Sequence, residues 1–419
     1  MRKRILSLVA CGVLAAASVA GMAACTPSEE GGGGGGGGTV ELTVWGPQAQ
    51  QDTIKEMVEL FKQANPDTTY DIEVGVCSEA DAYANVSKDP SAAADVYAYA
   101  NDQIVNLVRV GGLARVGGSN AEAVENDNGE GAVAAATFQG NLYGYPYAAD
   151  NGYFMYYDKS VVSEEQAQTL EGIIEACEAA GKRIAWPLDD SWYVAGMFFT
   201  FDCGYEVTYD AATGAESSIT CTFNNAGGIK ASKAMKKLTE SSSFAGKGTN
   251  NDTIIAGFND GTTAVAVTGT WNATAIEDAL GENYAACKLP TVTVDGETKQ
   301  ISSFAGYKIY GVNPTSDNLA EAHKLAAFLA SEDMQELRFK EHAIGPTNKV
   351  VAASDEVAAN VALAALSDQN QYAVAQTAVP TNFWDPVRGY GLAIIDGLAE
   401  SEFQAQLDQM VSLIVNTAQ

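Results

Sequence analysis

The chain has 419 residues, of which 47% are hydrophobic, and 53 acidic residues against 24 basic ones give a formal net charge of −29 at pH 7. This length and apolar share supply material for more than one hydrophobic core, which favours two lobes. A chain this acidic repels phosphate backbones, so its charge argues against nucleic acid as a partner.

The N-terminus, residues 1–25, has the pattern of an export signal: three basic residues, a short apolar run, and small residues before Cys25. A transmembrane anchor is the alternative, but it needs about twenty apolar residues, and small and polar residues dilute this run. The segment Met22-Ala23-Ala24-Cys25 also resembles the bacterial lipobox, in which the cysteine is acylated and becomes the mature N-terminus. We therefore expect lipid on Cys25 to hold the protein on the outer face of the bacterial cell membrane.

Residues 26–38 include eight consecutive glycines. Glycine loses the most backbone entropy on ordering, so this segment cannot hold a packed structure. It is predicted to be a tether, and the folded part to begin at Thr39.

The first elements after the tether predict a βαβ unit. Val40–Trp45 alternates apolar and polar residues as a half-buried strand does, and Tyr70–Val74 alternates again. Between them, Ile54, Met57, Val58 and Phe61 have helical spacing, and Asn65-Pro66 ends that helix. Strand, helix and strand at this spacing predict a parallel sheet covered by helices.

A related pattern, of a helix followed by a strand, comes later in the chain. Residues 254–260 have the pattern of a helix end, Gly261 of a left-handed residue after it, and Thr263–Thr268 of a buried strand. Because ligands of open α/β sheets lie beyond the carboxyl ends of strands, Trp271 is placed at such a site. Helices are also predicted near 320–330 and 403–414, and the fold class is α/β.

Five cysteines follow Cys25, and an odd number leaves at least one free thiol. Cys203 and Cys221 flank two β-rich runs around a turn at Thr213-Gly214, so a disulfide between them and two free thiols are equal alternatives. Buried inert thiols are the expectation for Cys77, Cys177 and Cys287.

The sequence lacks the common catalytic motifs. Its two histidines, His323 in a predicted helix and His342 in a predicted loop, are not part of a metal-binding pattern. The chain also has no Walker A sequence and no nucleophile-elbow sequence. We predict neither an enzyme nor a cofactor. A carboxylate pair for glycoside hydrolysis remains the alternative, because the many acids allow many pairs.

Tryptophans are the more informative residues. Trp45, Trp192, Trp271 and Trp384 lie at predicted strand ends or in turn-rich segments, where indole rings can stack on the C–H faces of a sugar. For each of them an ordinary core position is the equal alternative. Trp186, which precedes a proline, is assigned to the core.

Several blocks, in a common order, resemble the bacterial extracellular solute-binding proteins of the maltose/maltodextrin-binding type. They are AGFNDGTTAVAVTGTW at 256–271, ADVYAYANDQIVNLVRVGGLARV at 94–116, NLYGYPYAADNGYFMYYDKSVV at 141–162 and PTNFWDPVR at 380–388.

The resemblance implies roles for particular residues. Tyr99 would stack on sugar and Asp102 would accept bonds from its hydroxyls. Tyr193, Trp271 and Trp384 would form a stacking platform, with Arg388 near its rim, and Asp150 would be a further acidic contact for which Asn151 competes. The chain departs from the family at Gln48, Gln50, Gln103 and Ser191; Asp190 or Trp192 would compensate for the last, and these departures leave maltose itself open.

For the fold, the resemblance implies a two-lobed periplasmic-binding-protein-like architecture of type II, with a hinge between the lobes and ligand in the interlobe cleft. The implied lobes are 39–149 plus 310–358, and 150–309 plus 359–419. The implied protein is a monomer that binds an oligosaccharide and delivers it to an ABC permease driven by a separate ATPase. A malto-oligosaccharide is the expected ligand, and a different oligosaccharide is the alternative. A surface glycoside hydrolase and a structural or adhesive lipoprotein are the rival interpretations.

Overall fold

A computed structural model describes residues 38–210 and 214–416. The predicted export signal, the acylation site at Cys25 and all of the predicted tether except Gly38 lie outside these residues. Within the described ranges, no helix is long and apolar enough to cross a membrane.

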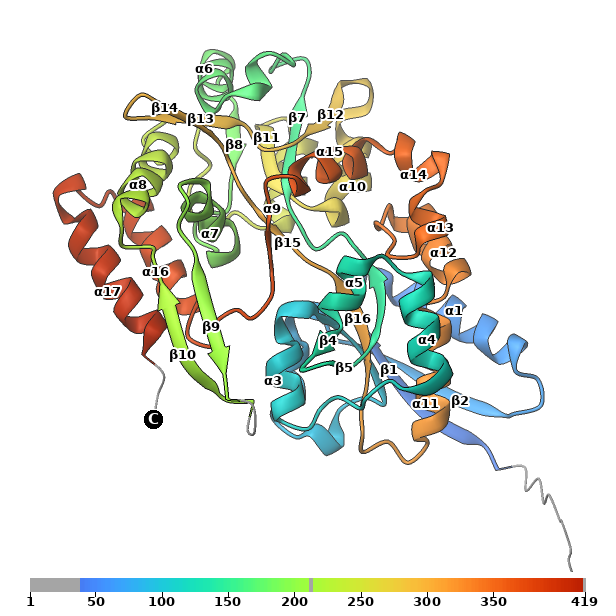
Figure 1. Cartoon of the computed structure of the whole chain (residues 1–419). Helices are drawn as coiled ribbons and strands as arrows, with labels where there is room; N and C mark the ends of the chain where they lie inside the picture. Colours follow the sequence, from blue (N-terminus) through green and yellow to red (C-terminus); the bar gives the residue numbers. More distant parts are fainter. Residues whose placement is uncertain (1–37, 211–213, 417–419) are drawn as a thin grey trace, which may run out of the picture. The chain divides into compact units, whose positions relative to one another are not determined.

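The first sheet has five strands in the order β2-β1-β3-β16-β6 (Figure 1). These strands are β1 Val40–Gly46, β2 Tyr70–Val76, β3 Val96–Ala100, β6 Tyr145–Ala148 and β16 Lys308–Val312. β1 is parallel to β2 and β3, whereas β16 is antiparallel to β3 and β6. A strand from late in the chain therefore completes a sheet that the N-terminal part begins, and we name this part the first lobe.

The predicted βαβ unit is confirmed. Helix α1 spans Gln51–Ala64 between β1 and β2, and its predicted apolar stripe is buried. Ile54, Met57 and Phe61 are each fully buried. Burying such a side chain contributes about 1.5–3 kcal/mol, which holds the helix against the sheet.

The second sheet has four strands in the order β12-β7-β11-β8, and we name the part around it the second lobe. The strands are β7 Phe154–Asp158, β8 Arg183–Ala185, β11 Thr263–Thr268 and β12 Tyr284–Cys287. As predicted, α9 (Asn251–Asn259) precedes Gly261 at φ +72°, and every residue of β11 is buried.

The remaining helices cover these sheets or pack on one another. In chain order they are α2 Ala82–Val86, α3 Ile104–Arg109, α4 Gly118–Asp127, α5 Glu130–Ala135, α6 Leu170–Ala180, α7 Ser191–Thr200, α8 Ala226–Thr239, α10 Ala273–Leu280, α11 Leu319–Leu329, α12 Glu332–His342, α13 Lys349–Ala352, α14 Asp355–Ala359, α15 Val361–Asn370, α16 Trp384–Ile395 and α17 Phe403–Val415. The predictions near 320–330 and 403–414 are confirmed by α11 and α17. His323 lies in its predicted helix, but the loop prediction for His342 is wrong, because it is the last residue of α12.

Short strand pairs complete the structure. They are β4 Thr137–Phe138 with β5 Asn141–Leu142, β9 Tyr205–Tyr209 with β10 Glu216–Cys221, β13 Thr291–Val294 with β14 Glu297–Gln300, and β15 Phe304–Ala305 with β17 Val374–Ala375. The β9–β10 pair is the predicted hairpin. Cys203 and Cys221 at its base are both free thiols, so of the two alternatives the structure contains the free thiols.

Each lobe has its own hydrophobic core. In the first, Tyr97, Tyr99 and Tyr310 lie among aliphatic side chains; in the second, Phe198 stacks on Phe223, with ring centroids 4.3 Å apart. Trp186 is 1% exposed, which confirms its assignment to the core. The chain passes between the lobes from β6 to β7 and from β15 to β16, so hinge motion would bend these segments.

Candidate functional site

The turn beyond the carboxyl end of β11 positions Trp271. The indole ring lies over Gly269, where an added Cβ would come within 2.1 Å of the ring, so only glycine leaves room. The Trp271 Nε1–H donates to Asn251 Oδ1 at 3.0 Å, which fixes the ring direction. The sequence prediction that this tryptophan lies at a strand end is confirmed.

A second tryptophan joins it from the start of α7. Asp190 caps this helix by accepting a bond from Trp192 N–H at 2.9 Å. The Trp192 and Trp271 rings lie with centroids 5.9 Å apart and planes inclined by 39°. Both side chains are partly exposed, so each can offer part of a ring to a ligand.

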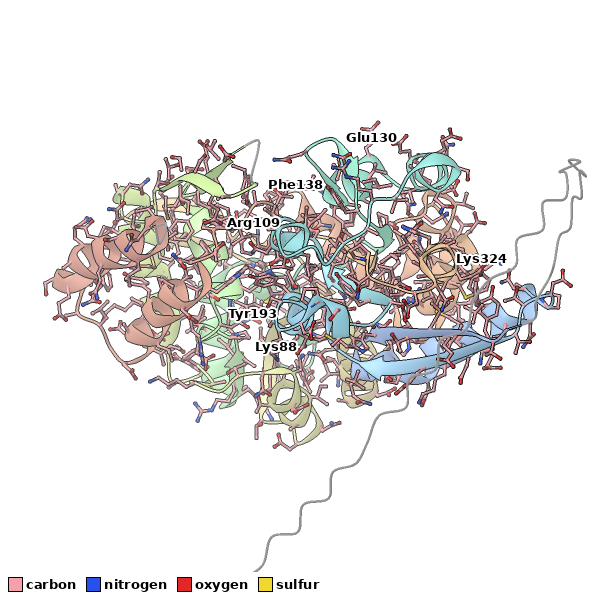
Figure 2. All side chains as sticks on the ribbon, turned by 90° about the horizontal axis from the view of Figure 1, so that it is seen from below. Lys88, Arg109, Glu130, Phe138, Tyr193 and Lys324 are labelled. Carbon is pink, nitrogen blue, oxygen red and sulfur yellow. The ribbon has the colours of Figure 1, made fainter. Side chains whose placement is uncertain are left out.

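Two tyrosines pack against the indole of Trp192. The ring of Tyr153 lies 4.7 Å from that of Trp192 and 4.7 Å from that of Tyr193, and its hydroxyl donates to the Trp192 carbonyl at 3.1 Å. Tyr193, labelled in Figure 2, is only 7% exposed. Its ring meets that of Trp192 nearly at a right angle, with centroids 5.2 Å apart and planes at 82°. Tyr153 was not among the predicted site residues.

A buried ion pair lies beside Trp271, where the chain crosses between the lobes. Lys308 Nζ in β16 lies 3.0 Å from Asp150 Oδ1, and Thr270 Oγ1 donates to Asp150 Oδ2 at 2.8 Å. The same ammonium lies 5.5 Å from the Trp271 ring centroid, within cation–π range. Burial alone would lower the pKa of Lys308, but the negative charges of Asp150 and Glu79 reverse this and raise it.

The first lobe contributes a second acid. Burial raises the pKa of the Asp102 carboxyl to about 7, although a hydrogen bond from Gln376 opposes this shift. One oxygen, Oδ1, is buried without a hydrogen-bond partner in the described residues. An unpaired carboxylate oxygen of this kind is an acceptor ready for a ligand hydroxyl.

Gln376 links this acid to the aromatic cluster. Its Oε1 accepts from Trp192 Nε1–H at 2.7 Å, and its backbone carbonyl accepts from Asn101 Nδ2–H at 2.6 Å. Asn151 Nδ2 lies 3.5 Å from the same Oε1. Through this side chain, Asp102 and Asn101 of the first lobe are connected to Trp192 of the second.

The structure thus brings together most of the predicted residues in one region. They are Asp102, Asp150, Trp192, Tyr193 and Trp271. Asp150 is fully buried and already neutralised by Lys308, so it reaches this region through Thr270 and not as an open acid.

Tyr99 requires a correction. It is fully buried in the first core, and its hydroxyl donates to the Tyr143 carbonyl at 3.3 Å. Gly144 and Gly311 leave the space that this side chain fills. A Cβ at Gly144 would lie 3.2 Å from the Tyr99 hydroxyl, and a Cβ at Gly311 would lie 3.1 Å from the Tyr99 ring. This ring is packed within the first core and has no exposed face.

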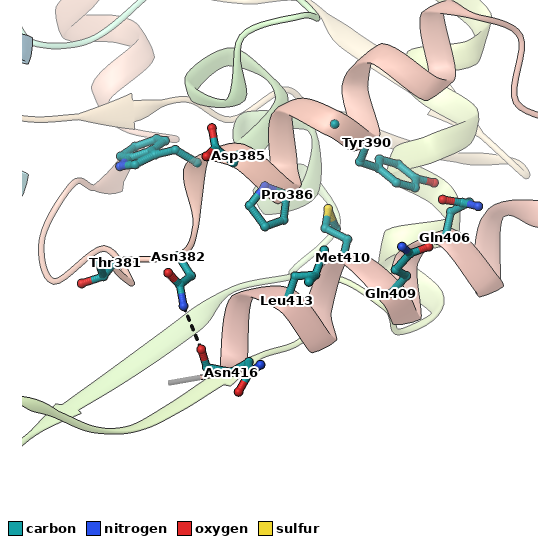
Figure 3. A pocket seen from close by; sticks show the side chains of 12 residues that line it. Thr381, Asn382, Asp385, Pro386, Tyr390, Gln406, Gln409, Met410, Leu413 and Asn416 are labelled. Atoms are coloured by element: carbon teal, nitrogen blue, oxygen red, sulfur yellow. Dashed lines mark hydrogen bonds between the residues drawn. The ribbon is translucent and has the colours of Figure 1, made fainter. Parts of the chain in front are cut away.

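Three other predicted residues make no ring or cation–π contact with the pair among the described residues. Trp45 in β1 packs over Gly75 of β2, and Arg388 is exposed and donates through Nε to the Asp189 carbonyl at 3.1 Å. Trp384 begins α16, where its ring contacts those of Phe304 and Phe383. It also lines a hollow of about 860 Å³ between α16 and α17, together with Tyr390, Met410 and Leu413 (Figure 3).

The four residues that depart from the family pattern differ in burial and in their hydrogen bonds. Gln48 is exposed, whereas Gln50 is buried and its Oε1 has no hydrogen-bond partner within residues 38–210 and 214–416. Gln103 ties the loop before α2 to α3 by donating to the Glu79 and Ala80 carbonyls. Ser191, the first residue of α7, is buried.

Lys308, Gln376 and Asn101 were missed by the sequence interpretation. Each follows or begins a strand, but none belongs to a motif whose spacing marks it as functional. Their partners lie far away in the chain, so local pattern gave no signal for them. Among the described residues, no group of three or more histidines, cysteines and acids could hold a metal ion.

Comparison with known proteins places this geometry in a family. The profile of the bacterial extracellular solute-binding proteins matches residues 56–365. The galactooligosaccharide-binding protein of Bacillus subtilis (strain 168) is 26% identical over 403 residues, covering 93% of this chain and 92% of that protein. A solved structure with acarbose is 32% identical with a TM-score of 0.81, covering 90% of this chain and 99% of the other.

The maltodextrin-binding protein of L. casei BL23, solved without ligand, has the same fold, with a TM-score of 0.76 at 23% identity over 90% of this chain and all of that one. The predicted two-lobed α/β architecture is therefore confirmed. The chain belongs to the family of bacterial extracellular solute-binding proteins.

Proposed function

We propose that this protein binds an oligosaccharide between its lobes and delivers it to an ABC permease driven by a separate ATPase. The observation that carries the proposal is the partly exposed Trp192–Trp271 pair, with the unpaired Asp102 oxygen on the opposite lobe. Indole faces stack on sugar C–H groups, and carboxylate and amide oxygens accept from sugar hydroxyls. This combination of indole faces and acceptor oxygens fits a carbohydrate better than a peptide or an inorganic ion.

The proposed ligand is a malto-oligosaccharide, and a different oligosaccharide is the alternative. The relative solved with acarbose and the maltodextrin-binding protein of L. casei BL23 support the first, and the galactooligosaccharide-binding relative supports the second. The surface glycoside hydrolase is the less favoured rival, because the family consists of binding proteins. Release of reducing sugar from starch would identify it.

Ligand binding would close the lobes. Contacts to sugar from both lobes favour the closed form, and the ligand shifts the balance only by its differential affinity for the two forms. The proposed lobe bounds are 39–149 plus 310–358, and 150–309 plus 359–419. Trp45, Trp384 and Arg388 would contact sugar only if closure brought them to it.

The protein would act at the outer face of the cell membrane as a lipid-anchored monomer. Support comes from its extracellular family and from the lipobox-like sequence that ends at Cys25. Cys25→Ala would abolish acylation and release the protein from the membrane fraction. Retention of that variant on the membrane would contradict the anchor.

Isothermal titration against maltotriose, acarbose and β-1,4-galactotriose tests the proposed function. We expect saturable one-to-one binding of at least one of these sugars, with quenching or enhancement of tryptophan fluorescence. Trp186→Phe is a matched control, since that indole lies in the core and should leave the affinity unchanged. Absence of binding to all three sugars at millimolar concentration would contradict the proposal.

A further inference from the structure

Tyr205 is the first residue of β9, at the base of the β9–β10 hairpin. Its ring packs in the second lobe against Phe383, with centroids 5.1 Å apart, and against Phe199 at 6.3 Å. Its hydroxyl is buried and has no hydrogen-bond partner among the described residues. Leaving a buried hydroxyl unpaired costs about 1–3 kcal/mol. Packing explains the ring of Tyr205, but it does not explain why this ring carries a hydroxyl.

A second unpaired polar atom lies in the first lobe. Asp102 Oδ1 is also buried and without a hydrogen-bond partner in the described part of the chain. The hairpin that carries Tyr205 contacts Arg109 of α3, the helix that begins two residues after Asp102. In agreement with this placement, burial first and then the Asp102 charge raise the pKa of the Tyr205 hydroxyl. No hydrogen bond joins them directly, so a donor and an acceptor from different lobes are left open in the same region.

The hairpin that carries Tyr205 reaches from one lobe to the other. Towards its far end, the ring of Tyr209 meets that of Phe138 of β4 edge-on, with centroids 5.7 Å apart and planes at 86°. Beyond it, a Cβ built on Gly214 would lie 3.6 Å from Arg109 Cγ. Arg109 and Phe138, both first-lobe residues, are labelled in Figure 2. The hairpin is therefore anchored at both ends, which holds Tyr205 in a fixed place.

We propose that Tyr205 is a ligand-binding residue that acts together with Asp102. Its O–H donates to one sugar hydroxyl, which in turn donates to Asp102 Oδ1. A sugar hydroxyl suits this place because it accepts and donates at once, and one such group satisfies both unpaired atoms. This inference rests on the proposed function and adds a specific hydroxyl contact, from the hairpin, to the indole pair.

The test is isothermal titration of the full chain and of Tyr205→Phe with whichever of maltotriose, acarbose and β-1,4-galactotriose the unaltered protein binds. We expect Tyr205→Phe to weaken binding at least tenfold. Its melting temperature should be unchanged or higher, because the variant removes only an unpartnered buried hydroxyl.

Tyr390→Phe is the matched control. Tyr390 is also buried in the second lobe, but its hydroxyl is paired with Ser232 Oγ at 2.5 Å. This variant should therefore melt at a lower temperature and keep its affinity, which is the reverse of the pattern expected for Tyr205→Phe.

A double-mutant cycle adds a second criterion. If Tyr205 and Asp102 share one ligand hydroxyl, the loss in Tyr205→Phe/Asp102→Asn will be smaller than the product of the two single losses. Affinity of Tyr205→Phe within twofold of the unaltered protein, or strictly multiplicative losses, would overturn this inference while leaving the proposed function intact. Failure of the unaltered protein to bind any of the three sugars would instead remove the proposed function, and this inference with it.

Discussion

The ammonium of Lys308, the first residue of β16, lies 3.0 Å from the carboxylate of Asp150, which lies in the connection between β6 and β7. The Lys308 side chain is 9% exposed and that of Asp150 is fully buried, so neither charge has adequate water around it. Asp150 also accepts a hydrogen bond from Thr270, and the Lys308 ammonium lies over the Trp271 ring. The ion pair therefore positions the turn that carries both of these residues.

Removing only the cation should be strongly destabilising. Lys308→Met leaves the Asp150 charge buried and unpaired, and we expect the free energy of unfolding to fall by about 3–5 kcal/mol. Urea denaturation at pH 7 measures it. The double variant Lys308→Met/Asp150→Leu should regain most of the loss, because no charge then remains in the interior. A single variant within about 1 kcal/mol of the unaltered protein would be at odds with this account.

The two indoles of the pair should dominate ligand affinity. Trp271→Ala and Trp192→Ala are each expected to weaken sugar binding by about 2 kcal/mol, roughly thirtyfold, since aromatic anchors carry most of the energy of such sites. Trp186→Phe, whose ring lies in the core of the second lobe, is the comparison, and titration calorimetry gives the three affinities. Equal losses in all three variants would show that the pair has no special role.

Gly269 tests the positioning of Trp271 without removing it. In Gly269→Ala the new Cβ would lie 2.1 Å from the indole, so the ring must move and sugar affinity should fall by tenfold or more. Gly389→Ala is the control, because no atom lies within 4 Å of the Cβ that it adds. Unchanged affinity in Gly269→Ala would mean that the observed ring position is not the one that binds ligand.

Asp102 should make stability depend on pH. The folded state raises its pKa from 3.8 to about 7, so the folded protein binds more protons than the unfolded chain between these values. Stability therefore falls as pH rises from 4 to 7, by up to about 4 kcal/mol, and is then constant with respect to this group. Denaturation curves of the unaltered protein and Asp102→Asn, measured from pH 4 to 8, should diverge over this window. Parallel curves would contradict the raised pKa.

The sequence predicted the parts of the fold that depend on local pattern. The spacing of Ile54, Met57 and Phe61 defines α1, and the uninterrupted apolar run of β11 defines a buried strand, because each pattern is created by one element facing one core. Trp271 could be placed at the site for the same reason, since its position follows from where its strand ends.

The rest depends on contacts between distant segments. Lys308 and Gln376 acquire their roles only when β16 returns to the first sheet and the segment after β17 approaches Asn101. Tyr99 was assigned to the ligand because its neighbours in sequence resemble a family block. Glycines at 144 and 311, on other strands, decide instead that its ring fills a space in the core.

A crystal structure of the protein with whichever of maltotriose, acarbose and β-1,4-galactotriose binds most tightly is the most direct test of where the ligand lies. We predict a sugar ring against the face of Trp271 or Trp192, with hydroxyl groups bonded to residues of both lobes, Asp102 among them. Sugar bound only in the hollow between α16 and α17, away from the indole pair, would contradict the central claim.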